Sequence, residues 1–176
     1  MSIAKNFFEI FSLPASWEID HSVLDKKFRM LQLTFHPDRY ANKNDFEKRL
    51  AVQTASTINQ AYETLSSPLL RAQYLLKLEG FDADQESHIT SDGQFLMQQM
   101  VLREALSDAK DSANPKDALV SLSIEAQQAA AKIQADFAQY FNTKEYNQAF
   151  DALAKMQFAC KFVNDISSLE AELEEL

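Results

Sequence analysis

The tripeptide His36-Pro37-Asp38 carries the residue types in this sequence that are best suited to chemistry. An imidazole and a carboxylate two positions apart can act as an acid–base pair, or they can stabilise a loop by a hydrogen bond. The proline between them fixes φ and removes a backbone donor, so the flanking side chains are held in a short, stiff turn. Such a turn also suits docking onto another protein. The context of the tripeptide has to decide among these interpretations.

The segment before the tripeptide predicts an amphipathic helix that begins after Asp20. Its apolar residues recur at spacings of three and four and form one stripe, made of Leu24, Phe28, Leu31 and Phe35. The other side of this helix faces solvent or a partner, and it carries Lys26, Arg29, Met30 and Leu33.

A second long helix is expected after the polar stretch 36–44. We expect one face of it to hold Phe46, Leu50, Ile58, Ala61, Tyr62 and Leu65. The two long helices then form an antiparallel hairpin with the tripeptide in its loop. Short helices are expected on either side of the hairpin, one before Pro14 and one from Pro68 to Gly80.

This context favours docking over acid–base catalysis. The sequence places no serine or cysteine nucleophile near His36 and Asp38, and it contains no glycine-rich phosphate loop. The pair is also expected on a convex helical hairpin rather than in a pocket. A loop-stabilising hydrogen bond and a hydrolase or metal site at His36 and Asp38 remain the alternatives.

The sequences FHPDRY and INQAYETL, with the four-helix layout over residues 6–78, resemble the J-domain family. The resemblance implies that the loop and the basic face of the preceding helix dock on the ATPase of a DnaK-class chaperone and stimulate ATP hydrolysis there. It carries over His36, Pro37 and Asp38, with Lys26 and Arg29 as electrostatic contacts. The chain departs from the family at Leu33 and Thr34, where a basic residue is common. Basic residues after the tripeptide can compensate, namely Arg39, Lys43, Lys48 and Arg49.

The second half of the chain predicts a three-helix bundle. Residues 81–91 are polar and form a linker, after which Ser91 or Asp92 can cap a helix. Asn114-Pro115 marks the next start, and Asn142 with Glu145 resembles a capping pair before the last helix. The inner face of that last helix is expected to hold Tyr146, Ala149, Leu153, Met156, Cys160 and Val163. We therefore expect an all-α chain with a J-domain at 1–78, a linker at 79–91 and a three-helix bundle at 92–176.

The first helix of the bundle has apolar residues on two sides. Phe95, Leu102 and Leu106 share one face, and a second set lies around the other side, namely Leu96, Met97, Met100 and Val101. One bundle face cannot bury both sets. The second set either packs against the first domain or the linker, or forms an adaptable patch for a protein partner, which flexible methionines suit.

Residues 76–176 resemble the client-binding domain of the HscB family, through LRAQYLLKLEGFD and FLMQQMVLRE. The resemblance implies a co-chaperone that presents an IscU-like iron–sulfur scaffold to an HscA-like chaperone. It carries over as scaffold-binding residues Leu96, Met97, Met100, Val101, Glu104, Asp108 and Phe158. Val101 departs from the family, where an acidic residue is expected. A J-domain protein that serves another client would share the loop but not this surface.

Composition limits the remaining classes of function. Only two glycines and four prolines occur, which disfavours a fold rich in sheet turns. The net charge is −9, with 17 basic against 26 acidic residues, so we expect no nucleic-acid partner. Cys160 is the only cysteine, which excludes an internal disulfide and a thiolate cluster site, and it is expected to be buried. No apolar run is long enough to cross a membrane. We expect a cytoplasmic protein without catalytic residues, metal or cofactor.

Overall fold

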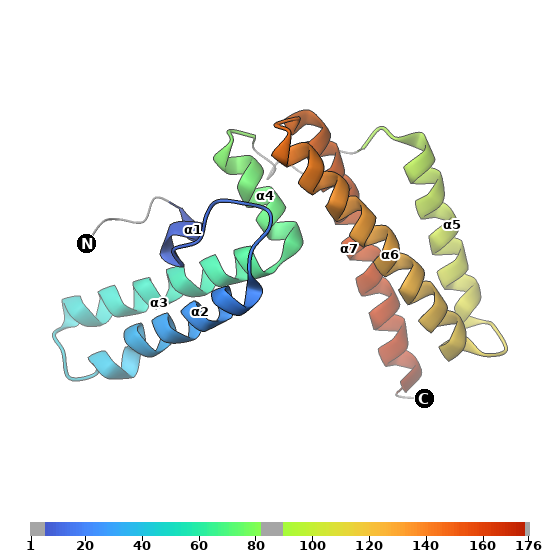
Figure 1. Cartoon of the computed structure of the whole chain (residues 1–176). Helices are drawn as coiled ribbons and strands as arrows, with labels where there is room; N and C mark the ends of the chain where they lie inside the picture. The colour runs from blue at the N-terminus through green and yellow to red at the C-terminus, as the bar shows by residue number, and fades with distance from the viewer. Residues whose placement is uncertain (1–5, 82–89, 175–176) are drawn as a thin grey trace. The chain divides into compact units, whose positions relative to one another are not determined.

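The computed structural model describes residues 6–81 and 90–174, and these divide into two helical units between Glu79 and Gly80 (Figure 1). Within these residues the regular structure is helical throughout, which confirms the all-α expectation. The first unit contains α1 (Phe7–Ile10), α2 (His21–Phe35), the 3-10 turn η1 (Pro37–Tyr40), α3 (Asp45–Ser66) and α4 (Pro68–Leu78). The second contains α5 (Gly93–Lys110), α6 (Pro115–Asn142) and α7 (Tyr146–Glu174).

Short polar side chains set the starts of the helices in the first unit. The Asp20 carboxylate accepts a hydrogen bond from the Val23 amide at 3.1 Å and so caps α2, as predicted. A capping box between Asn44 and Glu47 starts α3. Pro68 occupies the first turn of α4, where a backbone N–H would have no carbonyl partner within the helix, so its absence costs nothing.

The hairpin of α2 and α3 packs against α1 and α4. The Phe7 ring stacks on Tyr74 with centroids 4.6 Å apart, and the Phe7 amide donates to the Tyr74 hydroxyl at 2.9 Å. Phe8, Leu24 and Leu65 are buried completely at the centre of this unit. Burial of side chains of this size, at about 1.5–3 kcal/mol each, holds the short α1 in place.

Two residues predicted for the inner face of α3 are exposed instead. Phe46 is 75% and Leu50 is 52% accessible, whereas the buried residues of α3 are Ala51, Ile58, Ala61 and Leu65. Figure 1 shows the reason, since the first turns of α3 extend beyond α1 and α4 and have only η1 and the end of α2 beside them. The prediction for Phe46 and Leu50 was therefore wrong, because no element of the described residues covers that side.

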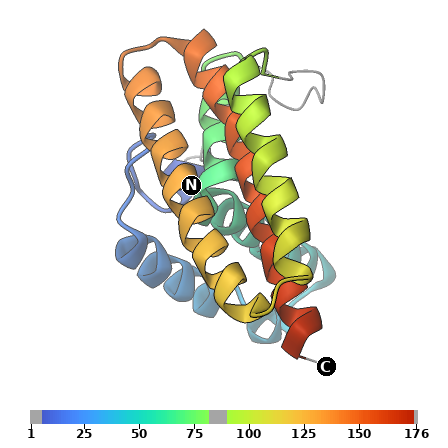
Figure 2. The ribbon, with the colours of Figure 1, turned by 90° about the vertical axis from the view of Figure 1, so that its right-hand side faces the viewer.

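Helices α5, α6 and α7 run side by side as the expected three-helix bundle (Figure 2). Helix α7 supplies most of its core, and the end of the bundle near the α5–α6 connection buries a cluster of Ala109, Leu119, Leu122, Ala126, Phe162, Ile166 and Leu169. Asp92 caps α5 through the Phe95 amide at 3.0 Å, as predicted. Asn142 ends α6 rather than capping α7, and Lys144 makes the turn with φ of 62°.

Cys160 is exposed, which contradicts its predicted place on the inner face of α7. After Met156 the buried positions continue through Ala159, Phe162 and Ile166, in steps of three and four. The prediction continued from Met156 to Cys160 and Val163, in steps of four and three, whereas the buried positions take two consecutive steps of three from Met156 to Phe162. The buried side of α7 therefore shifts by one position after Met156, and Cys160 falls outside it.

Candidate functional site

The loop between α2 and α3 displays His36 and Asp38 to solvent. Their side chains are 58% and 90% accessible, and His36 Nδ1 lies 3.6 Å from Asp38 Oδ2. The same nitrogen accepts a hydrogen bond from the Asp38 amide at 3.3 Å, which caps η1. The loop-stabilising hydrogen bond considered above is therefore present. It leaves the Asp38 carboxylate and the outer edge of the imidazole free to face a partner.

Arg39 folds back onto the end of α2. Its guanidinium donates to the Leu33 carbonyl at 2.9 Å, one of the carbonyls that a helix end leaves without an intrahelical donor. Arg39 was predicted as a chaperone contact. In the structure it also stabilises the loop, because its hydrogen bond connects the loop to the end of α2. The remainder of the guanidinium is exposed.

The outer side of α2 combines charge with exposed apolar residues. Lys26 and Arg29 are exposed as predicted, and beside them Met30 is 60% and Leu33 is 71% accessible. A groove of about 600 Å³ continues from this side toward α3, and it is lined by Arg29, Gln32, Leu33, His36, Ala55, Ile58 and Asn59. The surface next to the loop therefore combines basic side chains with exposed apolar ones, and is not purely basic.

The INQAYETL segment aligns α3 with α2. The Tyr62 ring stacks on Phe28 with centroids 3.9 Å apart, and its hydroxyl donates to Asp25 at 2.9 Å. This hydrogen bond raises the pKa of Tyr62. Asn59 accepts from the Gln32 amide at 3.4 Å. These contacts fix the hairpin whose loop carries His36, so this motif supports the loop from within the first unit.

On the second unit the outer side of α5 is apolar and open. Met97, Met100 and Val101 are 65%, 69% and 59% accessible, and Glu104 and Asp108 are exposed near them. Leu96 is half-buried, while Phe95 and Ala109 are buried on the opposite side of the helix. The predicted separation into an inner and an outer apolar set is therefore present.

Phe158, the residue of α7 predicted to bind the scaffold, contacts the inner side of α5. It is half-buried, and its ring meets Phe95 edge to face with centroids 6.0 Å apart. The Lys155 ammonium lies 5.7 Å from the centre of the Phe95 ring. Aromatic pairs in this arrangement contribute about 0.5–1.5 kcal/mol beyond their burial. The Phe95–Phe158 contact fixes the start of α5 against α7.

An ion-pair network that the sequence did not predict stabilises the end of the bundle where α5 begins. Lys155 Nζ lies 2.7 Å from Asp92 Oδ2 and 3.0 Å from Asp151 Oδ2. The hydrogen bond from Lys155 lowers the pKa of Asp92. Burial lowers the pKa of Lys155, but its hydrogen bonds to Asp92 and Asp151 outweigh burial and raise it. The i, i+4 spacing of Asp151 and Lys155 was visible in the sequence, whereas the partner 63 residues away was not.

The described residues contain no group of three or more histidine, cysteine, aspartate or glutamate side chains arranged to hold a metal ion. Among the helices in these ranges, none is long and apolar enough to cross a membrane.

Comparisons with known families match both parts of the chain. Residues 6–74 match the family described as the DnaJ domain, and residues 91–167 match the HSCB C-terminal oligomerisation domain. The co-chaperone protein HscB homolog of Vibrio cholerae serotype O1 is 40% identical over 172 residues, which covers 96% of this chain and 98% of that protein. A homolog from Shewanella loihica is also 40% identical, over 96% of this chain and 95% of that protein.

The fold is likewise that of solved HscB structures. The chaperone HscB from Vibrio cholerae superposes with a TM-score of 0.86 at 38% identity, over 96% of this chain and 99% of that one. The first unit is therefore a J-domain, and it is followed by an HscB-type helical domain. With both family matches in their expected order, this chain belongs to the HscB family of J-domain co-chaperones.

Proposed function

We propose that this protein is a two-ended adaptor for iron–sulfur cluster assembly. The J-domain docks onto an HscA-like chaperone of the DnaK class and stimulates its ATPase, while the bundle holds an IscU-like scaffold. The observation that carries the proposal is that each of the two units of one chain presents an exposed candidate surface, the loop at His36 and the outer side of α5.

At the chaperone end, the docking residues are His36, Pro37, Asp38, Lys26, Arg29 and Arg39. The exposed Asp38 carboxylate and His36 imidazole offer hydrogen bonds and charge to the partner ATPase. Arg39 contributes mainly by holding the loop, since its guanidinium binds the Leu33 carbonyl. ATP hydrolysis takes place in the partner, so this chain needs no catalytic group of its own.

At the scaffold end, the binding residues are Leu96, Met97, Met100, Val101, Glu104, Asp108 and Phe158. Three of the apolar members are more than half exposed, and the two carboxylates border them. Exposed methionines next to a rim of charge are typical of protein-binding surfaces. Holding both partners on one chain raises their effective concentration toward each other.

ATP turnover by the HscA-like chaperone tests this proposal. It would be measured with and without the IscU-like scaffold, with wild type, His36→Gln, and a Leu96→Ala/Met97→Ala/Phe158→Ala variant added in turn. We expect His36→Gln to abolish stimulation, and we expect the triple variant to lose only the part that depends on the scaffold. Circular dichroism checks that each variant is folded.

The outcomes separate the alternatives. Stimulation by wild type that survives in the triple variant with scaffold present would indicate a J-domain protein with another client. An absence of stimulation by wild type would contradict the proposal as a whole. Intrinsic ATP or ester hydrolysis by the purified protein, lost in His36→Gln, would favour an enzyme.

A further inference from the structure

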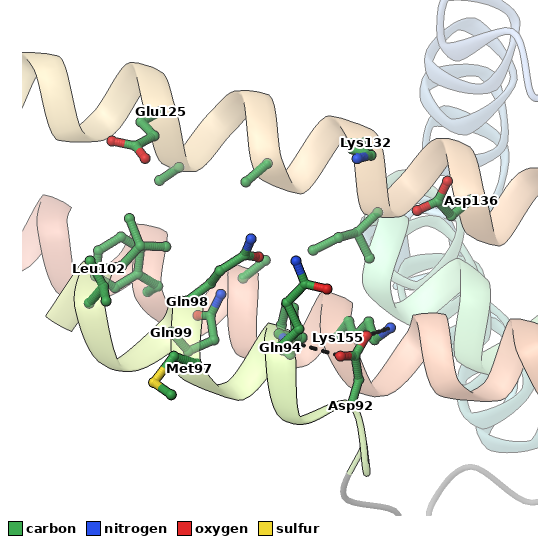
Figure 3. A pocket seen from close by; sticks show the side chains of 17 residues that line it. Asp92, Gln94, Met97, Gln98, Gln99, Leu102, Glu125, Lys132, Asp136 and Lys155 are labelled. Atoms are coloured by element: carbon green, nitrogen blue, oxygen red, sulfur yellow. Dashed lines mark hydrogen bonds and ion pairs between the residues drawn. The ribbon is translucent and has the colours of Figure 1, made fainter.

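A groove of about 590 Å³ runs between α5 and α6 in the second unit (Figure 3). Its floor is made of small or apolar side chains, with Ala126, Ala129 and Ile133 from α6 and Ala159 and Phe162 from α7. Ala126, Ala159 and Phe162 are less than 9% accessible, and Ala129, which is half-buried, is the most open part of this floor. A groove of this volume is within the range of protein sites that bind peptides and small molecules.

Three carboxamides from α5 line one wall. The side chains of Gln94 and Gln98 extend toward α6, while Met97 points away from it (Figure 3). Gln99 is only 9% accessible, and within the described residues its amide has no hydrogen-bond partner. Among the described residues, only Arg71 Nε is a fully buried side-chain atom without a hydrogen-bond partner, so the Gln99 amide still reaches solvent and can pair with a bound group.

The spacing of these amides fits an extended polypeptide. Gln94 and Gln98 are one helical turn apart, which is about 6 Å along the axis. Every second residue of an extended chain recurs at about 6.6 Å, with its backbone N–H and C=O groups pointing the same way. Successive glutamines can therefore pair with the backbone of an extended segment, while its alternate side chains rest on the alanine floor.

The charges at the groove select a cationic segment. Lys155, at one end, is already bound by Asp92 and Asp151. The opposite wall then leaves two carboxylates, Glu125 and Asp136, against one ammonium group, Lys132. The bundle as a whole belongs to the acidic half of the chain, which favours a segment that contains lysine or arginine.

We propose that this groove binds an extended, cationic segment of the same scaffold protein that covers the outer side of α5. The proposal rests on the function proposed above. Val101 and Met97, the latter at the edge of the groove with its side chain turned away from α6, also belong to the scaffold-binding surface, so a bound protein can contact both. The groove thus extends that surface toward α6, and its glutamines form hydrogen bonds with the backbone of the scaffold.

Filling the groove tests the proposal. Ala129→Phe places a ring over the floor, and the matched control Ala131→Phe places the same ring on the exposed side of α6. Affinity for the full-length IscU-like scaffold would be measured by titration calorimetry. We expect Ala129→Phe to weaken binding about tenfold, which corresponds to the loss of one or two hydrogen bonds to the segment, and Ala131→Phe to bind as wild type.

A second pair of variants removes the amides without touching the packing. Gln94→Ala/Gln98→Ala should weaken scaffold binding, and Gln128→Ala/Gln139→Ala, whose glutamines are exposed on α6, should not. Thermal melts followed by circular dichroism verify folding. If wild type binds the scaffold and all four variants bind equally, the groove proposal is wrong while the adaptor stands.

Two other results would overturn the assignment. If wild type does not bind the scaffold at all, the proposed function fails, and the groove proposal fails with it. If the groove variants instead change self-association in sedimentation experiments and leave scaffold affinity unchanged, the occupant is a second copy of this chain.

Discussion

At the scale of single residues, the sequence was most informative where the backbone itself is constrained. Pro37 and its neighbours predicted a stiff, exposed loop, and the structure has His36 and Asp38 open to solvent on η1. The tie between Arg39 and the Leu33 carbonyl could not be predicted. It depends on how a long, flexible side chain folds back over a turn, and residue types alone do not specify that path.

The exposed apolar residues of α2 change how docking responds to salt. Leu33 is 71% accessible and lies beside Arg29. An exposed position on the outer side of α2 is therefore apolar where it could carry a positive charge. Leu33→Lys adds a cation there. We expect the concentration of co-chaperone needed for half-maximal ATPase stimulation to fall a few-fold at low salt, because charge pairs strengthen encounter. At 1 M salt, where the Debye length is about 3 Å, this advantage should disappear.

The control for this change is Val120→Lys, which adds the same charge at a residue of α6 that is 55% accessible. It should leave half-maximal stimulation close to the wild-type value at both salt concentrations. If both lysines improve stimulation equally, general attraction by net charge explains the effect, and the docking face is not the one assigned to α2.

At the scale of helices, the starts were predictable and the faces were predictable only in part. Asp20, Pro68 and Asp92 mark starts through local chemistry that the sequence displays directly. Phe46 was misplaced because exposure depends on which neighbour reaches that part of α3. Cys160 was misplaced because the buried side of α7 shifts by one position after Met156. Both errors concern tertiary geometry rather than helix propensity.

The network at the start of α5 predicts a dependence of stability on pH. The pKa of Asp92 is lowered from 3.8, chiefly by its hydrogen bond from Lys155. The stabilisation from this carboxylate is therefore complete above about pH 4, the unfolded pKa, and is lost as pH falls through the lower folded value. Asp92→Asn keeps the capping oxygen but removes the charge. In urea unfolding, the stability gap between wild type and Asp92→Asn should be larger at pH 7 than at pH 3.

Asp165→Asn provides the control for this prediction, because Asp165 is exposed on α7 and has no ion pair in the described structure. Its stability should follow wild type at both pH values, apart from the general effect of one fewer negative charge. An Asp92→Asn gap that is the same at pH 3 and pH 7 would show that the ion pair with Lys155 contributes nothing that depends on charge.

At the scale of the whole molecule, the two halves of the chain already differ in charge in the sequence. Residues 1–75 hold 9 basic and 8 acidic residues, and the remainder holds 8 and 18. A J-domain followed by an HscB-type helical domain then identifies the chain as an HscB-family co-chaperone. The groove beside α5 was not predictable, because it depends on the separation of two helices rather than on the pattern of either one.

The central claim is that one chain links two partners, and mixing two defective full-length chains tests it most directly. His36→Gln retains the scaffold-binding surface, and Leu96→Ala/Met97→Ala/Phe158→Ala retains the J-domain loop. Tethering requires both surfaces on the same chain. Scaffold-dependent ATP turnover by the HscA-like chaperone would be measured with each variant and with an equimolar mixture. The account predicts that the mixture stays well below wild type. Full recovery in the mixture would contradict it, because the two surfaces would then act without being joined.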